Sequence, residues 1–145
     1  MYLADYHMHS KYSFDGSEEL DTICQTAVRR GLSEIAITDH MDIYTGLPYD
    51  EQMNFDVPGG EQHHMDAVGL YKELCNMKEK YAGQLKVRIG AELGQPQVNP
   101  EAAELFMKDY GDVLDFVIGS IHNMEKDLDV YYYDFTKIDV VKMYD

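Results

Sequence analysis

The 145-residue sequence lacks tryptophan, has only two cysteines and four prolines, and contains no apolar run near the roughly eighteen residues that cross a bilayer. It also lacks a basic N-terminal region followed by an apolar segment, which would indicate a secretory signal. These absences argue against a disulfide-stabilised secreted domain and against a membrane protein, and we expect a cytoplasmic location. Both cysteines, Cys24 and Cys75, fall in helix-like segments, where reduced, packed thiols are expected.

Positive charge is also scarce, because 12 Lys and Arg face 27 Asp and Glu and leave a net charge of −15. Such a chain repels a polyphosphate backbone, so nucleic acid is not expected as a partner. A small phosphate-bearing substrate would be repelled too, unless the site held positive charge of its own, which bound metal ions could supply. With 45% hydrophobic and 27% charged residues, the composition is that of one globular unit or part of one.

Hydrophobic spacing predicts strands that alternate with helices. The expected strands cover residues 3–7, 34–38, 85–93 and 114–121. The expected helices cover residues 17–30 with Ser17 as N-cap, 63 or 64 to 81, 100–108, and a last helix that begins near 136. Residues 39–60, rich in Asp, Gly and Pro, are expected to form a long loop of the kind that often serves function. The alternation predicts one α/β domain with a parallel sheet, because no shift in composition marks a boundary.

Each expected strand leads into a residue of a type that binds metals. "YHMH" ends the first strand, "TDH" follows the second, "GAELG" closes the third and "GSIHN" the fourth. Because the carboxyl ends of parallel strands meet at one face, His7, His40, Glu92 and His122 are expected to be neighbours. Side chains alternate along a strand, so His9 would point the same way as His7, and the two imidazoles could hold one ion. This pair and the other three strand ends together predict a metal site.

Single residues of this region have plainer interpretations as well. Glu92 could bridge two cations, but it could also be a strand-end carboxylate in solvent. Asp39 is expected to form a turn or to support a ligand rather than to bind metal itself. Asp15 precedes a glycine, which on local sequence favours a turn. His63 and His64 are expected to be exposed residues at a helix start.

The set "HMHSKYSFDG", "ITDH", "GAELG" and "GSIHN", in this order, resembles the polymerase and histidinol phosphatase (PHP) superfamily. The "YYYD" that follows resembles its histidinol-phosphatase branch. The resemblance spans nearly the whole chain and implies a distorted (β/α)7 TIM-like barrel. Residues 1–145 would be the N-terminal portion of that PHP domain, about four β/α units, because a barrel of this kind takes about 250 residues. The family's later strands and its Asp-x-His ligand pair do not follow His122 in this sequence.

The resemblance also implies up to three divalent cations, zinc, iron or manganese, at the carboxyl ends of the strands. In the family pattern His7 and His9 hold one ion, Glu92 bridges it to a second ion held also by His122, and Asp15 with His40 holds a third. Through these ions, Glu92 and His122 would take part in catalysis. The histidine pair of the N-terminal stretch would then form the first wall of a multinuclear site.

The activity implied is a metal-dependent phosphomonoesterase that hydrolyses histidinol phosphate to histidinol and phosphate in histidine biosynthesis. One alternative is a PHP phosphoesterase that acts on another small phosphate ester. A metal-dependent amidohydrolase also opens with His-x-His, but commonly places a carboxylated lysine where this chain has Glu92 and His122. A third alternative is a PHP module that binds metal or a partner without catalysis. Residues 1–145 alone are expected to have little activity, and an exposed sheet edge offers a route to self-association.

Overall fold

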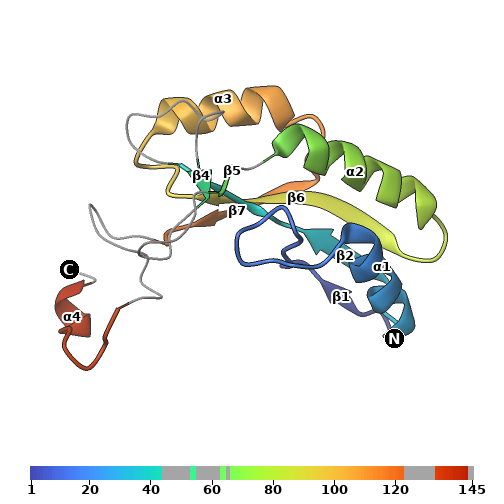
Figure 1. Cartoon of the computed structure of the whole chain (residues 1–145), viewed down its shortest axis with the longest axis horizontal. Coiled ribbons are helices and arrows are strands. Elements are labelled where there is room, and N and C mark those ends of the chain that lie inside the picture. The colour runs from blue at the N-terminus through green and yellow to red at the C-terminus, as the bar shows by residue number, and fades with distance from the viewer. Residues whose placement is uncertain (44–52, 55–62, 65, 123–132, 144–145) are drawn as a thin grey trace.

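A parallel sheet organises the chain, and three helices cover one of its faces (Figure 1). The structure is a computed structural model that describes residues 1–43, 53–54, 63–64, 66–122 and 133–143. The strands of the main sheet are β1 (Ala4–Asp5), β2 (Glu34–Ile37), β3 (His40–Asp42), β6 (Lys86–Gly94) and β7 (Phe116–Ser120). Two short strands, β4 (Met53–Asn54) and β5 (His63–His64), form a separate antiparallel pair. The parallel α/β architecture predicted from the alternation of elements is therefore confirmed.

The long strand β6 lies at the centre of the main sheet. Its first half pairs with β2, with Ile37 opposite Ile89, and its second half pairs with β3, with His40 opposite Glu92. The register does not change between these two segments, so β2 and β3 occupy one strand position that is interrupted at Thr38 and Asp39. The sequence-based expectation of a loop from residue 39 was wrong for the residues of β3, because pairing with β6 resumes there.

The first three helices match predicted segments, but two of their starts differ from the prediction. Helix α1 (Leu20–Arg29) has Glu19 at its N-cap position, not Ser17, and Glu19 makes no side-chain cap. Helix α2 (Ala67–Lys80) begins after Asp66, whose carboxylate accepts a hydrogen bond from Gly69 N. The predicted start at residue 63 or 64 was wrong, because those two residues form strand β5.

The remaining helices differ more in length. Helix α3 (Pro100–Tyr110) is capped by Asn99, whose side chain accepts from Ala102 N, and proline occupies its first turn as predicted. Helix α4 covers only Val140–Met143, because residues from 136 form a turn in which Asp134 accepts from Thr136 N. The predicted end of this helix, at residues 144–145, lies outside the described part of the chain.

The core lies between the sheet and helices α1, α2 and α3 (Figure 1). Alternate sheet residues point into it, namely Ile35, Ile37, Val87, Ile89, Ala91 and Leu93. The helices contribute the fully buried side chains Leu20, Leu70, Leu74 and Phe106. Cys24 packs in this core as predicted, and its burial raises the pKa of the thiol to about 11, whereas Cys75 is exposed and not packed. One face of the sheet is thus buried against the helices, and the other face can carry polar residues.

The opposite sheet face has charged residues at both ends of its strands. At the amino ends of the strands, buried Glu34 accepts from Arg88 Nε at 2.6 Å and from the hydroxyl of Tyr6 at 2.5 Å. The hydrogen bonds of Arg88 hold the pKa of Glu34 below its usual range.

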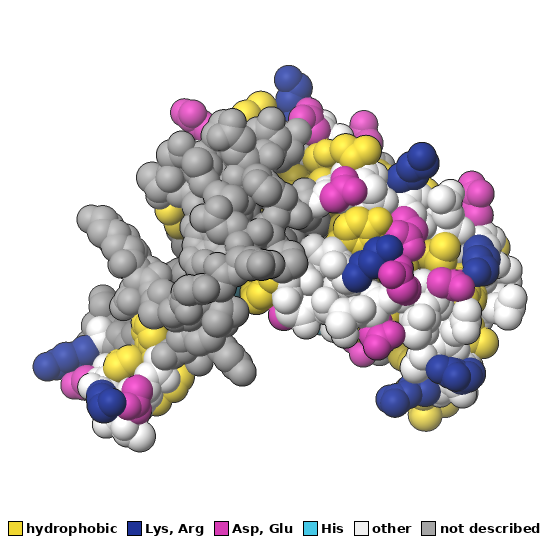
Figure 2. All heavy atoms as spheres, viewed as in Figure 1, with side chains coloured by type: hydrophobic (Ala, Val, Ile, Leu, Met, Phe, Trp, Pro, Cys, Tyr) yellow, Lys and Arg dark blue, Asp and Glu magenta, His cyan; other side chains and the backbone are white. Residues whose placement is uncertain are grey.

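On the outer surface of the molecule, acidic and basic side chains are interspersed over α1 and α2 (Figure 2). No helix in the described ranges is long and apolar enough to cross a membrane.

Candidate metal centre

The residues predicted to converge lie at one end of the sheet. His40 begins β3, Glu92 lies near the end of β6, and His122 follows β7 by two residues. His7 and His9 follow β1. His7, His9, Glu92 and His122 lie at or just beyond the carboxyl ends of β1, β6 and β7, and His40 lies three residues beyond the carboxyl end of β2. The carboxyl ends of parallel strands are where such a sheet brings ligands from distant parts of the chain together.

Glu92 is at the centre of this group. Its Oε2 lies 3.4 Å from Nε2 of His7, 2.9 Å from Nε2 of His9 and 3.6 Å from Nδ1 of His40. Its Oε1 lies 2.9 Å from Nε2 of His122. One buried carboxylate therefore touches all four of the histidines that the sequence placed in the site.

The environment of Glu92 keeps it ionised. Burial by itself raises the pKa of this carboxyl group, but hydrogen bonds from His122 and Ser120 and the close contact with His9 outweigh burial and hold the pKa well below its usual range. The Ser120 hydroxyl donates to Oε1 at 2.6 Å. The solvent-exposed alternative for Glu92 is excluded, because the residue is only 5% exposed.

Asp15 joins the site from the loop after His9. Nδ1 of His9 lies 3.0 and 2.9 Å from the two carboxylate oxygens of Asp15, and Nε2 of His40 lies 3.5 Å from one of them. The loop closes tightly here, since a Cβ on Gly16 would lie 2.0 Å from the carbonyl oxygen of Ser10. The Asp-Gly pair does form a turn, and that turn aims the carboxylate at two imidazoles.

Asp42 is the residue of the site that sequence reasoning missed. Its Oδ1 lies 3.0 Å from Nδ1 of His122, and its Oδ2 lies 3.7 Å from Nδ1 of His40. Asp42 is buried on β3, two residues after His40, so both side chains point to the same face. The signal was the i, i+2 spacing already used for His7 and His9, but residues 39–60 were expected to form a loop.

Three overlapping clusters result, in each of which one donor atom per residue lies within 4.8 Å of the others. They are His7, His9 and Glu92; His9, Asp15 and His40; and His40, Asp42 and His122. Imidazole and carboxylate donors in such groups suit zinc, iron or manganese. In the described part of the chain, Nε2 of His9 and Oε2 of Glu92 are buried and make no hydrogen bond, although they lie 2.9 Å apart. Donor atoms held together without hydrogen bonds fit a shared cation.

His9, His40 and His122 are strongly basic when no cation is bound. Burial lowers the pKa of His9 and of His40, but the neighbouring carboxylates outweigh burial and raise both to about 9. For His122, hydrogen bonds to Asp42 and Glu92 raise the pKa to about 10. Protons on the imidazoles therefore supply the positive charge that balances the carboxylates in the metal-free protein.

Further residues position the loop between β1 and α1. Asp39 is fully buried and accepts from Ser10 N at 2.6 Å and Ser10 Oγ at 2.7 Å. The Ser13 hydroxyl accepts from His40 N at 2.8 Å. The Phe14 ring stacks on the His40 imidazole with centroids 4.9 Å apart. Asp39 thus supports the segment that carries His9, in line with the supporting role expected for it.

The alternation argument for His7 and His9 was wrong in its detail. Strand β1 ends at Asp5, so neither histidine lies in a strand. The neighbours Tyr6 and His7 both contact the polar sheet face, Tyr6 through Glu34 and His7 through Glu92. The alternation of a strand is broken between them, and the loop after β1 brings the His7 and His9 rings to 5.0 Å.

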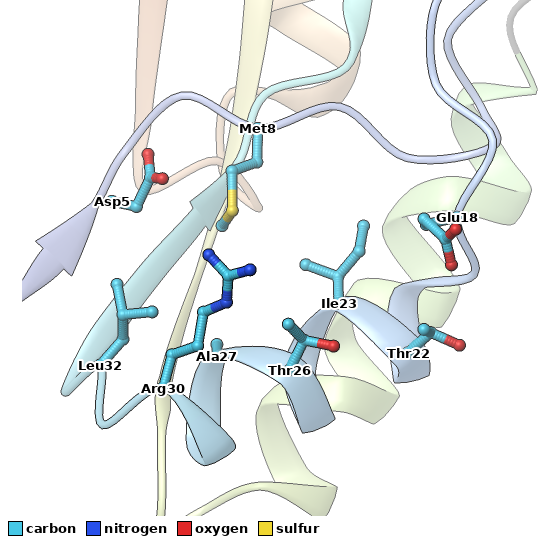
Figure 3. A pocket seen from close by; sticks show the side chains of 9 residues that line it. All are labelled: Asp5, Met8, Glu18, Thr22, Ile23, Thr26, Ala27, Arg30 and Leu32. Atoms are coloured by element: carbon cyan, nitrogen blue, oxygen red, sulfur yellow. The ribbon is translucent and has the colours of Figure 1, made fainter.

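A hollow beside α1 is separate from these clusters. A cavity of about 410 Å³ lies between β1 and α1, lined by Met8, Ile23, Leu32, Asp5 and Arg30 among others (Figure 3). Its lining includes none of the clustered histidines or carboxylates. The chemistry expected of the strand ends therefore does not lie in this cavity.

A parallel α/β sheet that gathers imidazoles and carboxylates at the carboxyl ends of its strands is typical of metal-dependent hydrolases built on barrels. The PHP domain model matches residues 5–145, and the chain belongs to this family. The histidinol-phosphatase of Lactococcus lactis is 28% identical over 127 residues, which are 88% of this chain and 41% of that protein. The histidinol-phosphatase of Bacillus subtilis is 26% identical over 85% of this chain and 45% of its own length.

Solved structures agree with this placement. The histidinol phosphate phosphatase of L. lactis, solved with zinc, L-histidinol and phosphate, has a TM-score of 0.64 and 26% identity over 84% of this chain and 41% of that chain. A putative histidinol phosphatase of Listeria monocytogenes has a TM-score of 0.68 at 20% identity, which supports the fold alone. The described elements form the N-terminal part of this TIM-barrel-like fold, as predicted, and the chain spans less than half of each relative.

Proposed function

We propose that the protein is a metal-dependent phosphomonoesterase that hydrolyses histidinol phosphate, and that residues 1–145 supply part of its metal centre. The observation that carries the proposal is the contact of one buried carboxylate, Glu92, with four imidazoles. The histidinol phosphatases among the relatives support the choice of substrate. Because the chain spans less than half of those relatives, the activity is proposed for the whole protein. Histidine biosynthesis and a cytoplasmic location are part of the same proposal.

The donor groups would hold up to three divalent cations. The sets proposed are His7, His9 and Glu92; Asp15 with His9 and His40; and His122 with Glu92, with Asp42 at its second nitrogen. When bound, such cations offset the charge of a phosphate ester and lower the pKa of a water molecule, which are the two requirements of its hydrolysis.

The chain's own groups have distinct tasks in this scheme. Glu92 and His122 are the proposed catalytic residues because they join neighbouring clusters through an Oε1–Nε2 distance of 2.9 Å. Asp42 orients the His122 ring through Nδ1, and Ser120 fixes Oε1 of Glu92. Without cations the imidazole protons only balance the carboxylates, so the site has no excess positive charge with which to hold a phosphate ester. Zinc, iron and manganese all suit the donors.

The test is hydrolysis of histidinol phosphate by the whole protein with zinc or manganese, followed by removal of the metal with a chelator. Activity should vanish on chelation and return with metal. Glu92→Gln should reduce kcat/KM by about 100-fold or more, because a ligand is lost and small displacements of reacting groups are costly. Glu104→Gln makes the same chemical change on an exposed face of α3 and should leave activity unchanged.

Two outcomes would favour other members of the family. Faster hydrolysis of a different phosphate ester would keep the phosphoesterase and replace the substrate. Metal binding without hydrolysis of any ester would favour a non-catalytic module.

A further inference from the structure

The corner after β6 contains an unusual backbone conformation. In the described part of the chain, Gln95 alone among residues other than glycine has a positive φ, of 52°. This left-handed conformation is unfavourable for a residue with a Cβ. Gln95 is also only 2% exposed, which is uncommon for a glutamine. A strained, buried polar residue three positions after Glu92 calls for a physical reason.

The reason lies in the pairing of β6 with β7. In a parallel sheet, a residue donates its N–H to a carbonyl group of the neighbouring strand. Its own C=O accepts from the N–H of the residue two positions further along that neighbouring strand. Gln95 N donates to Ser120 O at 2.8 Å, so the next bond of the ladder would join His122 N to the Gln95 carbonyl. The left-handed turn redirects that carbonyl, which instead accepts from Val98 N at 3.0 Å.

The side chain of Gln95 replaces the lost ladder bond. Its Oε1 accepts from His122 N at 2.5 Å, in place of the backbone carbonyl. His122 lies beyond the end of β7 at Ser120, so this bond ties it to β6 after strand pairing has ended. The Gln95 side chain thereby fixes the backbone of His122, an expected metal ligand, to the sheet.

The His122 ring is held at both nitrogens, so its backbone position matters. Nδ1 lies 3.0 Å from Asp42 Oδ1, and Nε2 lies 2.9 Å from Glu92 Oε1. The neighbouring corner residue is equally constrained, because a Cβ on Gly94 would lie 1.8 Å from Asp42 Oδ1. The turn at Gly94 and Gln95 is therefore shaped around the Asp42–His122 pair.

We propose that Gln95 is a positioning residue that holds His122 between Asp42 and Glu92 and thereby sets the metal affinity of the centre. The inference rests on the metal centre of the proposed function. It assigns a task to a residue outside the three donor clusters. The left-handed backbone at Gln95 is retained because the turn places the amide oxygen under His122 N.

Four variants of residues 1–145 separate the amide acceptor from backbone strain. Gln95→Met keeps the bulk and the strain but removes the acceptor. Gln95→Gly removes the acceptor and relieves the strain. Gln95→Glu keeps an acceptor oxygen at the same reach. Val98→Ala changes a partly exposed side chain in the same turn without touching the bond to His122, and serves as the control.

Two measurements read the effect. Calorimetric titration with zinc should show affinity reduced by about 10- to 100-fold in Gln95→Met and Gln95→Gly, as for other residues that orient metal ligands, and unchanged in Val98→Ala. Hydrogen exchange of the His122 amide in the metal-free protein should be faster by about 5- to 10-fold in the same two variants. Exchange should return to the wild-type rate in Gln95→Glu. The melting temperature of Gln95→Gly should be higher than that of Gln95→Met, because glycine relieves the backbone strain. The zinc affinity of the two variants should be the same, because both lack the amide acceptor.

The contrary results are distinct. Recovery of zinc affinity in Gln95→Gly would show that backbone strain, not the amide, matters, and would overturn the proposal. Weakened zinc binding with an unchanged His122 amide would overturn it too, because the effect would then come from elsewhere. If wild-type residues 1–145 bound no zinc, the metal centre and the positioning role would fall together. Zinc binding without phosphatase activity of the whole protein would contradict only the proposed function.

Discussion

His40 and Glu92 are register partners on the neighbouring strands β3 and β6, and Nδ1 of His40 lies 3.6 Å from Oε2 of Glu92. Paired residues of a parallel sheet point to the same face, so strand register alone brings these two donors together. The same rows continue across the sheet, where Glu92 pairs with Ile118 and Gly94 with Ser120. The candidate centre is thus a product of sheet register at the carboxyl ends of the strands.

Asp42→Asn should weaken metal binding at the centre, because Asp42 contacts both His122 and His40. The substitution removes the charge beside Nδ1 of His122, so zinc affinity of residues 1–145 should fall by about 10- to 100-fold. The pKa of His122 should fall as well, because Asp42 is the main cause of its elevation. Zinc calorimetry and an NMR titration of the His122 ring measure both effects. Asp112→Asn, at an exposed turn, is the matched control, and equal behaviour of the two variants would remove Asp42 from the site.

Gly94→Ala should disrupt the site by steric contact. The added Cβ would lie 1.8 Å from Asp42 Oδ1 and 3.1 Å from His122 Nδ1, so the Asp42 carboxylate must move. We expect weaker zinc binding and a loss of about 1–3 kcal/mol in the free energy of unfolding, as for other overpacked sites. Gly119→Ala on β7 meets no atom within 4 Å and should have little effect in urea unfolding or zinc titration. Wild-type zinc affinity in Gly94→Ala would contradict the geometry.

The metal-free protein should lose stability as pH rises from about 6.5 towards 10. The pKa values of His9, His40 and His122 are raised from 6.5 to about 9, 9 and 10, so the folded state binds more protons than the unfolded state in this window. Stabilisation by these groups is complete below the unfolded value and is lost as pH passes the folded values. Melting temperatures measured with a chelator present should therefore decline between pH 7 and 9. A flat or rising profile would be inconsistent with protonated imidazoles.

Zinc affinity should change with pH in the opposite direction. A cation must displace the protons of its imidazole ligands, so affinity should increase from pH 7 to pH 9. Calorimetry of residues 1–145 in buffers of different ionisation enthalpy should show protons released on binding. Binding without proton release across this window would argue against His9 and His40 as ligands.

Residues 1–145 by themselves should hydrolyse histidinol phosphate far more slowly than the whole protein, even with saturating zinc or manganese. The sheet of the described residues is open at β1 and β7, and the chain spans less than half of the length of its histidinol-phosphatase relatives. Catalysis depends on ligand geometry, and small displacements can cost about 100-fold in rate. Parallel assays of the fragment and the complete gene product measure the difference. Equal rates would show that the residues identified here make a complete site.

The order of strands and helices could be read from the sequence because burial on one face imposes a local period. The strand at 34–38 is found as β2 (Glu34–Ile37), and the strand at 85–93 as β6 (Lys86–Gly94), each within one residue of the prediction. The N-cap residue of each helix was harder to predict, because any of several polar residues near a helix start can accept a hydrogen bond from the first backbone N–H groups. At α2 the cap is Asp66, whose side chain accepts a hydrogen bond from Gly69 N.

The order of residues is enough to predict the parallel architecture and the convergence of four residues, His7, His40, Glu92 and His122, at one end of the sheet. Both follow from short-range periodicity and from the rule that parallel strands end on the same side. Three features follow instead from contacts made in the folded chain: the place of Asp42, the broken alternation between Tyr6 and His7, and the left-handed turn at Gln95. Each of these depends on partners distant in the chain: β6 for β3, Glu34 and Glu92 for the loop after β1, and His122 for the Gln95 amide. The local conformational preferences of a segment do not specify such partners, because the strand register that brings distant residues into contact is set by the packing of the whole sheet.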